Sequence, residues 1–396
     1  MPDPHVAFFA LQTTSNANGG LESLTQIIRR LDGRRAVVTN YDGRFTALWR
    51  GLPGVEVHVF DLPEIRALSG AALARYQLAR APALAAANAR FGAIVRRIGA
   101  RVAHFNDIGA FFFGAAGARA AGARTLLNVR DTRPPGAAYG LKWRLAYHLA
   151  DELVGLSREM KDELERRLRP LAPRAPHARV GYVYSAIDLE RMRPAMDRAA
   201  VRAELGIAPG ELAIVYVGTF NEKKAQLALI ENALAPLLAR LPHARVHFVG
   251  DFEPAREPYA RACEVAARAL ADSDRVVFHG FFERPELFYQ AADVVLLASQ
   301  NEGLARAMIE SLACGTPVVS FDVSSAREIL EAHGTGRVVR RGDYGGLVGA
   351  LTDLATEGAY KNVRERCTEL ARDLFDPRRS VEKYVEIYAR LAGRGA

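Results

Sequence analysis

The sequence predicts an α/β protein built from two Rossmann-like, doubly wound domains, each containing a parallel sheet. Apolar runs of strand length alternate with helical stretches along the whole chain, as in parallel sheets covered by helices. A chain of 396 residues is too long for one hydrophobic core and suits two domains. An apolar content of 49% with 25% charged residues is that of an ordinary globular protein.

Six strands are expected in the first half, each a short apolar run. They are VAFFAL at 6–11, RAVVTN at 35–40, VEVHVF at 55–60, RVAHFN at 101–106, RTLLNV at 124–129 and ELVGLS at 152–157. A helix is expected to begin near Leu21, and a long helical region is expected to end near Gly99.

Six further strands are expected in the second half, again with helices between them. They are LAIVYVG at 212–218, RVHFVG at 245–250, RVVFHG at 275–280, DVVLLAS at 293–299, TPVVSFD at 316–322 and GRVVRRGD at 336–343. The segment 191–202, with Pro194 and mixed charges, is the expected linker. A final helix is expected from about Arg378 to Leu391.

The charge is divided unevenly between the halves. Residues 1–195 hold 28 Lys and Arg against 17 Asp and Glu, or +11, whereas the remaining residues hold 25 against 28, or −3. The excess of 47 Arg over 6 Lys suggests a compositional bias, but this bias does not explain why only one half is basic. We expect the first half to meet an anionic partner, and nucleic acid, an anionic membrane surface or a phosphate-bearing acceptor all fit the charge.

The remaining composition favours a protein of the reducing cytoplasm. Cys263, Cys314 and Cys367 are widely spaced and suggest neither a metal site nor a disulfide framework. No apolar run is long enough to span a membrane. The start MPDPHVAFFALQTT lacks a basic segment and is expected to be a first strand rather than a signal peptide.

The run Ser299–Val319 is the most informative segment for function. Glu302 follows an apolar strand, and Glu310 is expected about two turns inside a helix whose apolar residues recur at four-residue steps. The two carboxylates would then lie roughly 12 Å apart along the axis. The amides of Gly303, Leu304 and Ala305 are expected to offer donors to an anion at the helix start. Acidic residues are also common at helix starts for electrostatic reasons alone.

The spacing E-x7-E with the ending A-C-G-T-P-V-V-S resembles the donor-site signature of the retaining glycosyltransferase family 4, also called glycosyl transferases group 1. The resemblance implies a GT-B fold, with Glu302 contacting the transferred sugar and Glu310 holding the ribose hydroxyls. It also implies an acceptor domain at 1–192, a nucleotide-sugar domain at 193–378 and a helix at 379–396 that packs back on the first domain.

Three further loops resemble donor-binding loops of this family. Gly19 and Gly20 stand at the glycine loop that faces the donor phosphates. In VGTFNEKKAQ, Gly218 and Lys223 match the family's G-R-L and E-K-G, whereas Thr219 replaces the arginine and Lys224 the second glycine. Gly280 and Phe281 stand where the family holds the nucleobase.

The acceptor side resembles the family less. His104 and Asn106 occupy the two histidine positions of its H-x-H segment, and Asn106 cannot accept a proton as imidazole does. Arg130 and Asp131 stand where many members have a histidine and an aspartate, with Arg133 nearby. These arginines are expected either to bind an anionic acceptor or to pair with Asp131 and Asp107.

The resemblance implies transfer of a sugar from a nucleotide diphosphate sugar to an acceptor hydroxyl, with retention, in polysaccharide, lipopolysaccharide or glycolipid assembly. Glu302, Lys223 and Asn106 are the expected catalytic residues. We expect no metal, no other cofactor and no nucleic-acid partner, an anionic or lipid-linked acceptor, and a cytoplasmic protein with peripheral contact at the inner membrane face. A nucleotide-sugar epimerase of the same fold and a catalytically silent nucleotide-sugar-binding protein remain the alternatives.

Overall fold

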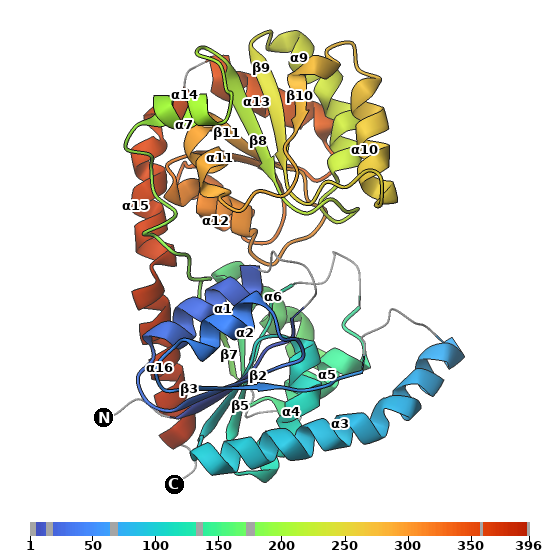
Figure 1. Ribbon diagram of the computed structural model, residues 1–396, viewed down its shortest axis with the longest axis vertical. Coiled ribbons are helices and arrows are strands. Elements are labelled where there is room, and N and C mark those ends of the chain that lie inside the picture. Colours follow the sequence, from blue (N-terminus) through green and yellow to red (C-terminus); the bar gives the residue numbers. More distant parts are fainter. Residues whose placement is uncertain are drawn as a thin grey trace. The chain divides into compact units, whose positions relative to one another are not determined.

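The computed structural model describes residues 5–12, 19–63, 70–131, 138–171, 179–356 and 359–393. The chain divides into two compact units: unit 1 comprises Met1–Ala186 and Pro377–Ala396, and unit 2 comprises Ile187–Asp376. The sequence placed the corresponding boundaries at residues 192 and 378. Figure 1 shows both units as strands flanked by helices.

Unit 1 contains a seven-stranded parallel sheet in the order β3-β2-β1-β4-β5-β6-β7. Its strands are β1 (Val6–Phe9), β2 (Arg35–Thr39), β3 (Val55–Val59), β4 (Val102–Phe105), β5 (Arg124–Asn128), β6 (Glu152–Gly155) and β7 (Arg179–Tyr182). Its helices are α1 (Gly19–Arg30), α2 (Arg44–Arg50), α3 (Gly70–Ile98), α4 (Ile108–Ala120), α5 (Leu141–Leu149), α6 (Arg158–Leu168), the short η1 (Arg169–Leu171) and α16 (Pro377–Gly393).

Unit 2 contains a six-stranded parallel sheet in the order β10-β9-β8-β11-β12-β13. Its strands are β8 (Leu212–Val217), β9 (Ala244–Val249), β10 (Val276–Phe278), β11 (Val294–Leu297), β12 (Val318–Phe321) and β13 (Gly336–Val339). Its longer helices are α7 (Arg198–Glu204), α10 (Pro258–Arg268), α12 (Arg306–Ala313), α13 (Tyr344–Thr356) and α15 (Arg364–Phe375). Its short helical segments are α8 (Gln226–Leu229), η2 (Ile230–Leu234), α9 (Ala235–Arg240), η3 (Ser273–Arg275), α11 (Glu286–Ala291), η4 (Arg327–Glu331) and α14 (Ala359–Asn362).

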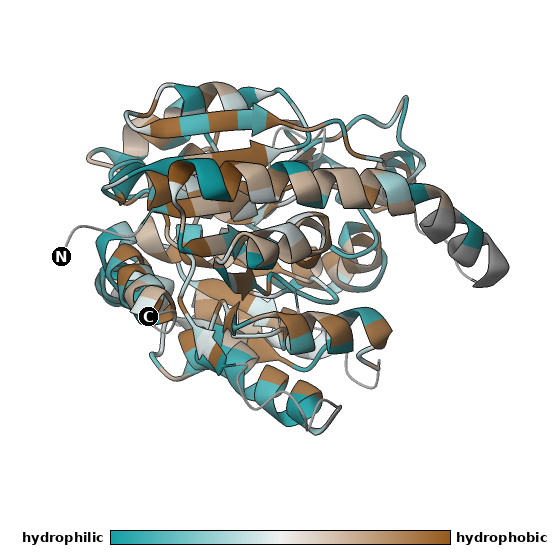
Figure 2. Ribbon diagram, turned by 90° about the horizontal axis from the view of Figure 1, so that it is seen from below, coloured by the Kyte–Doolittle hydropathy of each residue, from teal (hydrophilic) through white to brown (hydrophobic). Residues whose placement is uncertain are grey.

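The predicted α/β architecture with two doubly wound parallel sheets is confirmed. Most strands are buried on both faces, because helices cover the two sides of each sheet. Helices are banded in teal and brown in Figure 2, as expected for helices with one face on a core and one toward water. The sequence missed β7, a short edge strand whose pattern RVGY is only partly buried.

The strand order reverses once in each sheet, between β1 and β4 in unit 1 and between β8 and β11 in unit 2. Ligands of open α/β sheets bind outside the carboxyl ends of the strands at such a point. The helix after β4 begins sharply there, because Asp107 caps α4 by accepting a hydrogen bond from the Ala110 amide at 2.9 Å. A ligand site is therefore expected next to one or both of these reversal points.

Helix α16 belongs to unit 1, although in the sequence all of unit 2 lies between it and the rest of unit 1. Tyr384, Tyr388 and Leu391 are buried in the unit 1 core. The Tyr384 hydroxyl donates to Asn128 Oδ1 at 3.0 Å, and the Arg390 guanidinium lies 2.6 Å and 2.7 Å from the two carboxylate oxygens of Glu152. The last helix of the sequence prediction is therefore part of the unit 1 core.

Candidate functional site

The carboxyl edge of the unit 2 sheet carries two loops that hydrogen bonds tie together. One loop follows β8 and the other follows β11, so both flank the point where the strand order reverses. The Gln300 amide in the second loop donates to the Lys223 carbonyl oxygen in the first at 2.8 Å. The two segments that the sequence singled out, 218–224 and 302–305, therefore meet at one place.

A lysine and a glutamate form the charged centre of this edge. Lys224 Nζ lies 2.6 Å from Glu302 Oε1, and both side chains are largely buried, with exposed fractions of 21% and 9%. The Lys224 amide donates to Asn221 Oδ1 at 3.0 Å, and its carbonyl oxygen accepts from the buried Tyr216 hydroxyl. The backbone of Lys224 is thus fixed on both sides, which aims the side chain at Glu302.

The loop that carries the predicted E-K-G match changes direction at Ala225. Ala225 has a φ of 58°, the left-handed conformation that glycine adopts at no steric cost. The match of the motif's lysine to Lys223 and of its glycine position to Lys224 remains a prediction, and the position with the backbone angle of a glycine lies one residue later. Thr219, which replaces the motif's arginine, lies in the same loop, and its carbonyl oxygen accepts from Gln226 Nε2 at 2.9 Å.

Helix α12 begins at Arg306, later than the sequence predicted. Gly303, Leu304 and Ala305 form the turn that precedes the helix, and the Gly303 carbonyl oxygen accepts from Ser325 Oγ at 3.1 Å. Glu310 consequently lies just over one turn inside the helix rather than two. The amides of Gly303, Leu304 and Ala305 therefore belong to a buried turn rather than to the helix. That they bind an anion remains a prediction.

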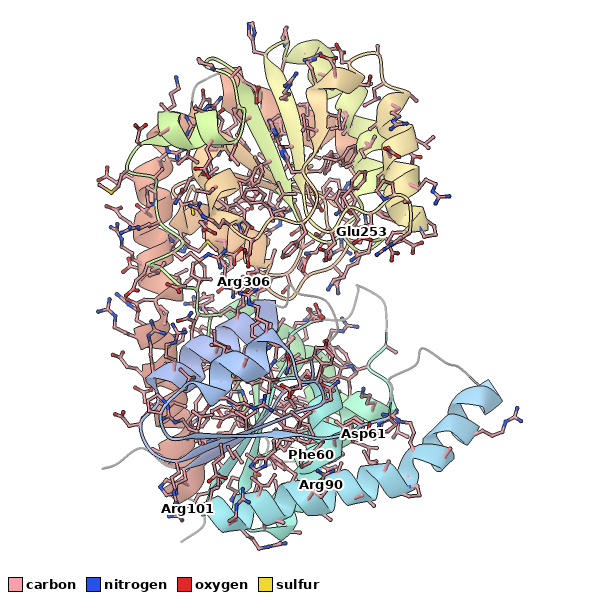
Figure 3. All side chains as sticks on the ribbon, in the orientation of Figure 1. Phe60, Asp61, Arg90, Arg101, Glu253 and Arg306 are labelled. Atoms are coloured by element: carbon pink, nitrogen blue, oxygen red, sulfur yellow. The ribbon has the colours of Figure 1, made fainter. Side chains whose placement is uncertain are left out.

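Glu310 is held at both carboxylate oxygens by residues that the sequence analysis did not select. Arg306 Nε lies 2.5 Å from Glu310 Oε1, and the Tyr289 hydroxyl donates to Oε2 at 3.0 Å. Glu310 and Tyr289 are both buried, with exposed fractions of 7% and 1%. Figure 3 labels Arg306 at the start of α12. The four-residue step from Arg306 to Glu310 was visible in the sequence as a helical ion pair, but Tyr289 gave no such signal.

The loop after β10 contains Gly280 and Phe281. Gly280 has a φ of 69°, and its carbonyl oxygen accepts from the Gly250 amide at 2.9 Å. The Phe281 side chain is 46% exposed, so a ring face is open to a ligand or to water. Their predicted contact with a nucleobase remains a prediction.

Two histidines lie side by side just before this loop. The His247 and His279 rings are stacked with centroids 5.2 Å apart, and His247 Nδ1 lies 2.9 Å from His279 Nε2. His247 Nε2 lies 2.9 Å from Glu211 Oε1. Burial, together with the neighbouring His247, lowers the pKa of His279 to about 4. His279 is therefore uncharged at neutral pH, and burial also lowers the pKa of His247.

In unit 1, Arg130 joins three loops at the carboxyl edge of the sheet. Its Nε donates to the Asn106 carbonyl oxygen at 3.1 Å, its Nη2 donates to the Gly20 carbonyl oxygen at 3.2 Å, and it also contacts the Asn106 side chain. Gly19 and Gly20 are the first residues of α1. The arginine thus brings Gly20 and Asn106, two predicted site residues, to one place.

The other residues predicted for the acceptor side are distributed differently. Asp131 is exposed, and Arg133 lies outside the described residues. Asp107 serves as the cap of α4, and burial raises its pKa above the usual range of an aspartate. Arg130 contacts the backbone and Asn106, and its predicted binding of an acceptor or pairing with Asp131 and Asp107 remains a prediction.

His104 is completely buried on β4. Its Nδ1 lies 2.6 Å from the Tyr388 hydroxyl, and its ring packs against Phe8 and Tyr384 with centroids 5.2 Å away in each case. Burial lowers the pKa of His104 to about 3, helped by the charge of Arg130. These contacts give His104 a role in packing α16, and its predicted contact with an acceptor remains a prediction.

The described part of the chain contains no candidate for two other kinds of site. No group of three or more His, Cys, Asp or Glu side chains there is placed to hold a metal ion. None of the described helices combines the length and apolar character needed to cross a membrane.

Comparison with known sequences identifies the second half of the chain. Residues 197–374 match the family described as Glycosyl transferases group 1. D-inositol 3-phosphate glycosyltransferase of Nocardia farcinica is 38% identical over 184 residues, which cover 45% of this chain and 40% of the relative. The enzyme of the same name from Mycobacteroides abscessus is 32% identical over 248 residues, covering 60% of this chain and 53% of the relative. The chain therefore spans about half the length of the curated relatives it matches.

Comparison with solved structures identifies the fold. The Anabaena protein HepE, solved in complex with UDP and glucose, matches with a TM-score of 0.78 at 20% identity, covering 98% of this chain and all of HepE. The chain therefore has the GT-B architecture that its sequence motifs implied.

Proposed function

Because its second unit belongs to the glycosyl transferases group 1 family, we propose that this protein transfers a sugar from a nucleotide diphosphate sugar to an acceptor hydroxyl with retention of configuration. The observation that carries the proposal is the pair Lys224 and Glu302. Lys224 Nζ and Glu302 Oε1 come from motifs 78 residues apart and lie 2.6 Å from each other. They lie at the reversal of strand order in the unit 2 sheet, the place at which open α/β sheets generally bind ligands.

The chemistry of this pair suits a reaction in which a diphosphate leaves a sugar. The ammonium group of Lys224 stabilises negative charge on the departing diphosphate, and Glu302 accepts hydrogen bonds from the sugar hydroxyls. In this proposal, Lys224 takes the role that the sequence analysis gave to Lys223, because its ammonium group lies 2.6 Å from Glu302 Oε1. Gly218, Thr219, Gly280, Phe281 and the turn 303–305 complete the proposed donor site, with Glu310 at the ribose.

The donor base is most simply tested with uridine. HepE was solved with UDP and with UDP-glucose, and it shares the fold of this chain. A thermal-shift series with nucleoside diphosphates should show the largest rise with the preferred base, since a ligand stabilises by RT ln(1 + [L]/Kd). Equal shifts with all bases would argue against the Gly280 and Phe281 loop as a base-binding element.

The proposed acceptor carries a phosphate or is linked to a lipid. The excess positive charge of residues 1–195 supports this, and the two named relatives act on an inositol phosphate. In this proposal, Asn106, Arg130 and Asp131 face the acceptor in unit 1, and the protein works at the cytoplasmic face of the membrane. The product would enter polysaccharide, lipopolysaccharide or glycolipid assembly.

A matched pair of variants tests the catalytic centre. Lys224→Gln keeps a hydrogen-bond donor for Glu302 but removes the charge, and we expect it to lower kcat by roughly 10²–10³-fold. Lys223→Gln, one residue away, should leave kcat nearly unchanged. Equal effects of the two changes would contradict the proposed role of Lys224.

Incubation with the donor alone separates the epimerase alternative from the other two functions. An epimerase converts the donor sugar without an acceptor, whereas a transferase and a silent binding protein do not. Conversion of the donor to its epimer would replace the proposal with the epimerase alternative.

A further inference from the structure

Helix α5 of unit 1 exposes a stripe of three leucines. Leu141, Leu145 and Leu149 are exposed by 70%, 42% and 40%, and they follow one another at four-residue steps. Residues at this spacing lie on one face of a helix. The opposite face is anchored to unit 1 through the buried Ala146 and Tyr147. The leucines thus form a continuous apolar ridge on a fixed helix.

Cationic side chains border this leucine stripe on both sides. At about 100° per residue, the leucines cover roughly 80° of the helix circumference, with Lys142 next to Leu149 and with Arg144 and His148 beyond Leu141. Lys142 and Arg144 are exposed, and the segment 141–149 contains no acidic residue. The same helix therefore offers apolar contact and positive charge to one partner.

An anionic lipid surface fits this combination. Amphipathic helices at membrane interfaces bury an apolar face at the boundary of headgroups and acyl chains, while Lys and Arg extend toward the anionic headgroups. The excess charge of +11 in residues 1–195 adds attraction to such a surface. The leucines are also concentrated on α5, which carries three of the four exposed leucines among the described residues.

We propose that α5 is a docking surface for an anionic lipid bilayer, with Leu141, Leu145 and Leu149 entering the interfacial layer and Lys142 and Arg144 meeting lipid headgroups. The inference deepens the proposed function, because it places a lipid-linked acceptor next to the unit that is proposed to bind it. It does not depend on the donor site in unit 2, which is measured separately.

The experiment compares binding of the full chain to vesicles of phosphatidylcholine with and without about one third phosphatidylglycerol. The triple variant Leu141→Ser, Leu145→Ser, Leu149→Ser removes the apolar ridge, and Lys142→Gln with Arg144→Gln removes the charge. Leu48→Ser with Val265→Ser serves as a matched control, since these side chains are exposed by 37% and 63% on α2 and α10. All changes are at exposed positions, so circular dichroism should show folded proteins.

We expect the wild type to bind anionic vesicles at least tenfold more tightly than neutral ones and to be released by salt. The leucine variant should lose at least tenfold in binding to anionic vesicles, the glutamine variant should lose the preference for anionic lipid, and the control should bind as the wild type does. Absence of wild-type binding, or equal losses in the control, would overturn the proposal and favour a protein partner for α5. UDP-induced thermal shifts should be the same in all four proteins. A loss of these shifts in the wild type would instead count against the proposed donor site.

Discussion

Replacement of Glu310 by alanine separates its proposed role in donor binding from its role in folding. The carboxylate is 7% exposed and accepts from Arg306 and from Tyr289, at 2.5 Å and 3.0 Å. If Glu310 also accepts from the ribose hydroxyls, the change removes a contact that substrate and transition state make alike. The donor KM should then rise more than kcat falls.

The two contributions are similar in size but affect different measurements. Loss of hydrogen bonds from ribose to a charged acceptor costs about 1.5–3 kcal/mol, which corresponds to roughly a 10- to 150-fold rise in the Kd for nucleoside diphosphate. For folding, the Tyr289 hydroxyl is left buried and unpaired, because Tyr289 is 1% exposed. An unsatisfied buried group of this kind costs about 1–3 kcal/mol of stability. Arg306 adds less to the folding cost, because its side chain is 19% exposed and reaches water.

Calorimetry with nucleoside diphosphate and urea unfolding give the two quantities separately. Tyr289→Phe is the matched control: it removes the hydrogen bond to Glu310 Oε2 but keeps the carboxylate. We expect it to cost about 0.5–1.5 kcal/mol of stability and to leave the Kd within a small factor. Unchanged nucleotide affinity in a folded Glu310→Ala protein would refute the ribose contact. An equal loss of affinity in Tyr289→Phe would show that carboxylate orientation, rather than its presence, controls binding.

Three further predictions concern metal, backbone and pH. Excess EDTA should leave activity unchanged, because the described residues offer no cluster that could hold a metal; loss of activity restored by magnesium would contradict this. Gly250→Ala should lower the free energy of unfolding by roughly 2–4 kcal/mol, because the new Cβ would lie 2.0 Å from the Gly218 carbonyl oxygen, at a φ of 157°. Gly349→Ala is the control: its Cβ would enter open space in α13, so it should raise the free energy of unfolding by about 0.5–1 kcal/mol in the same urea titration. The folded-state pKa of His279, about 4, lies below its ordinary 6.5, so the unfolded chain binds the proton first and stability should fall as pH falls from about 6.5 toward 4. His279→Gln should reduce the slope of the thermal midpoint against pH over this window, while the buried His104 keeps its own contribution. An unchanged slope would exclude His279 as a source of it.

The sequence was sufficient where one segment alone determines the structure. Apolar runs such as DVVLLAS were predicted as strands because burial on both faces leaves no polar alternation. The spacing of Glu302 and Glu310 was readable because both lie in one strand–turn–helix segment. The family resemblance then predicted the GT-B architecture of both halves, and the solved structures agree with it.

The sequence was insufficient where a contact joins distant segments or depends on a backbone angle. The partner of His104 is Tyr388, 284 residues away, and no local pattern links them. Lys224 reaches Glu302 from a residue 78 positions away, and the loop that carries it turns at Ala225 in a left-handed conformation that the sequence of an alanine does not predict. The start of α12 was placed too early because Leu304 and Ala305 are buried like helix residues although they lie in a turn.

The position of α16 has a consequence for biosynthesis. Unit 2 is continuous from 187 to 376, so all of its sheet contacts are available before residues 377–393 have left the ribosome. Unit 1 is then still incomplete, because Tyr388, Tyr384 and Arg390 of α16 have not yet reached His104, Asn128 and Glu152. Domains generally fold as units during synthesis. Unit 1 is therefore synthesised first but completes its core after unit 2. Until α16 packs against it, the polar groups of its interior stay accessible to chaperones.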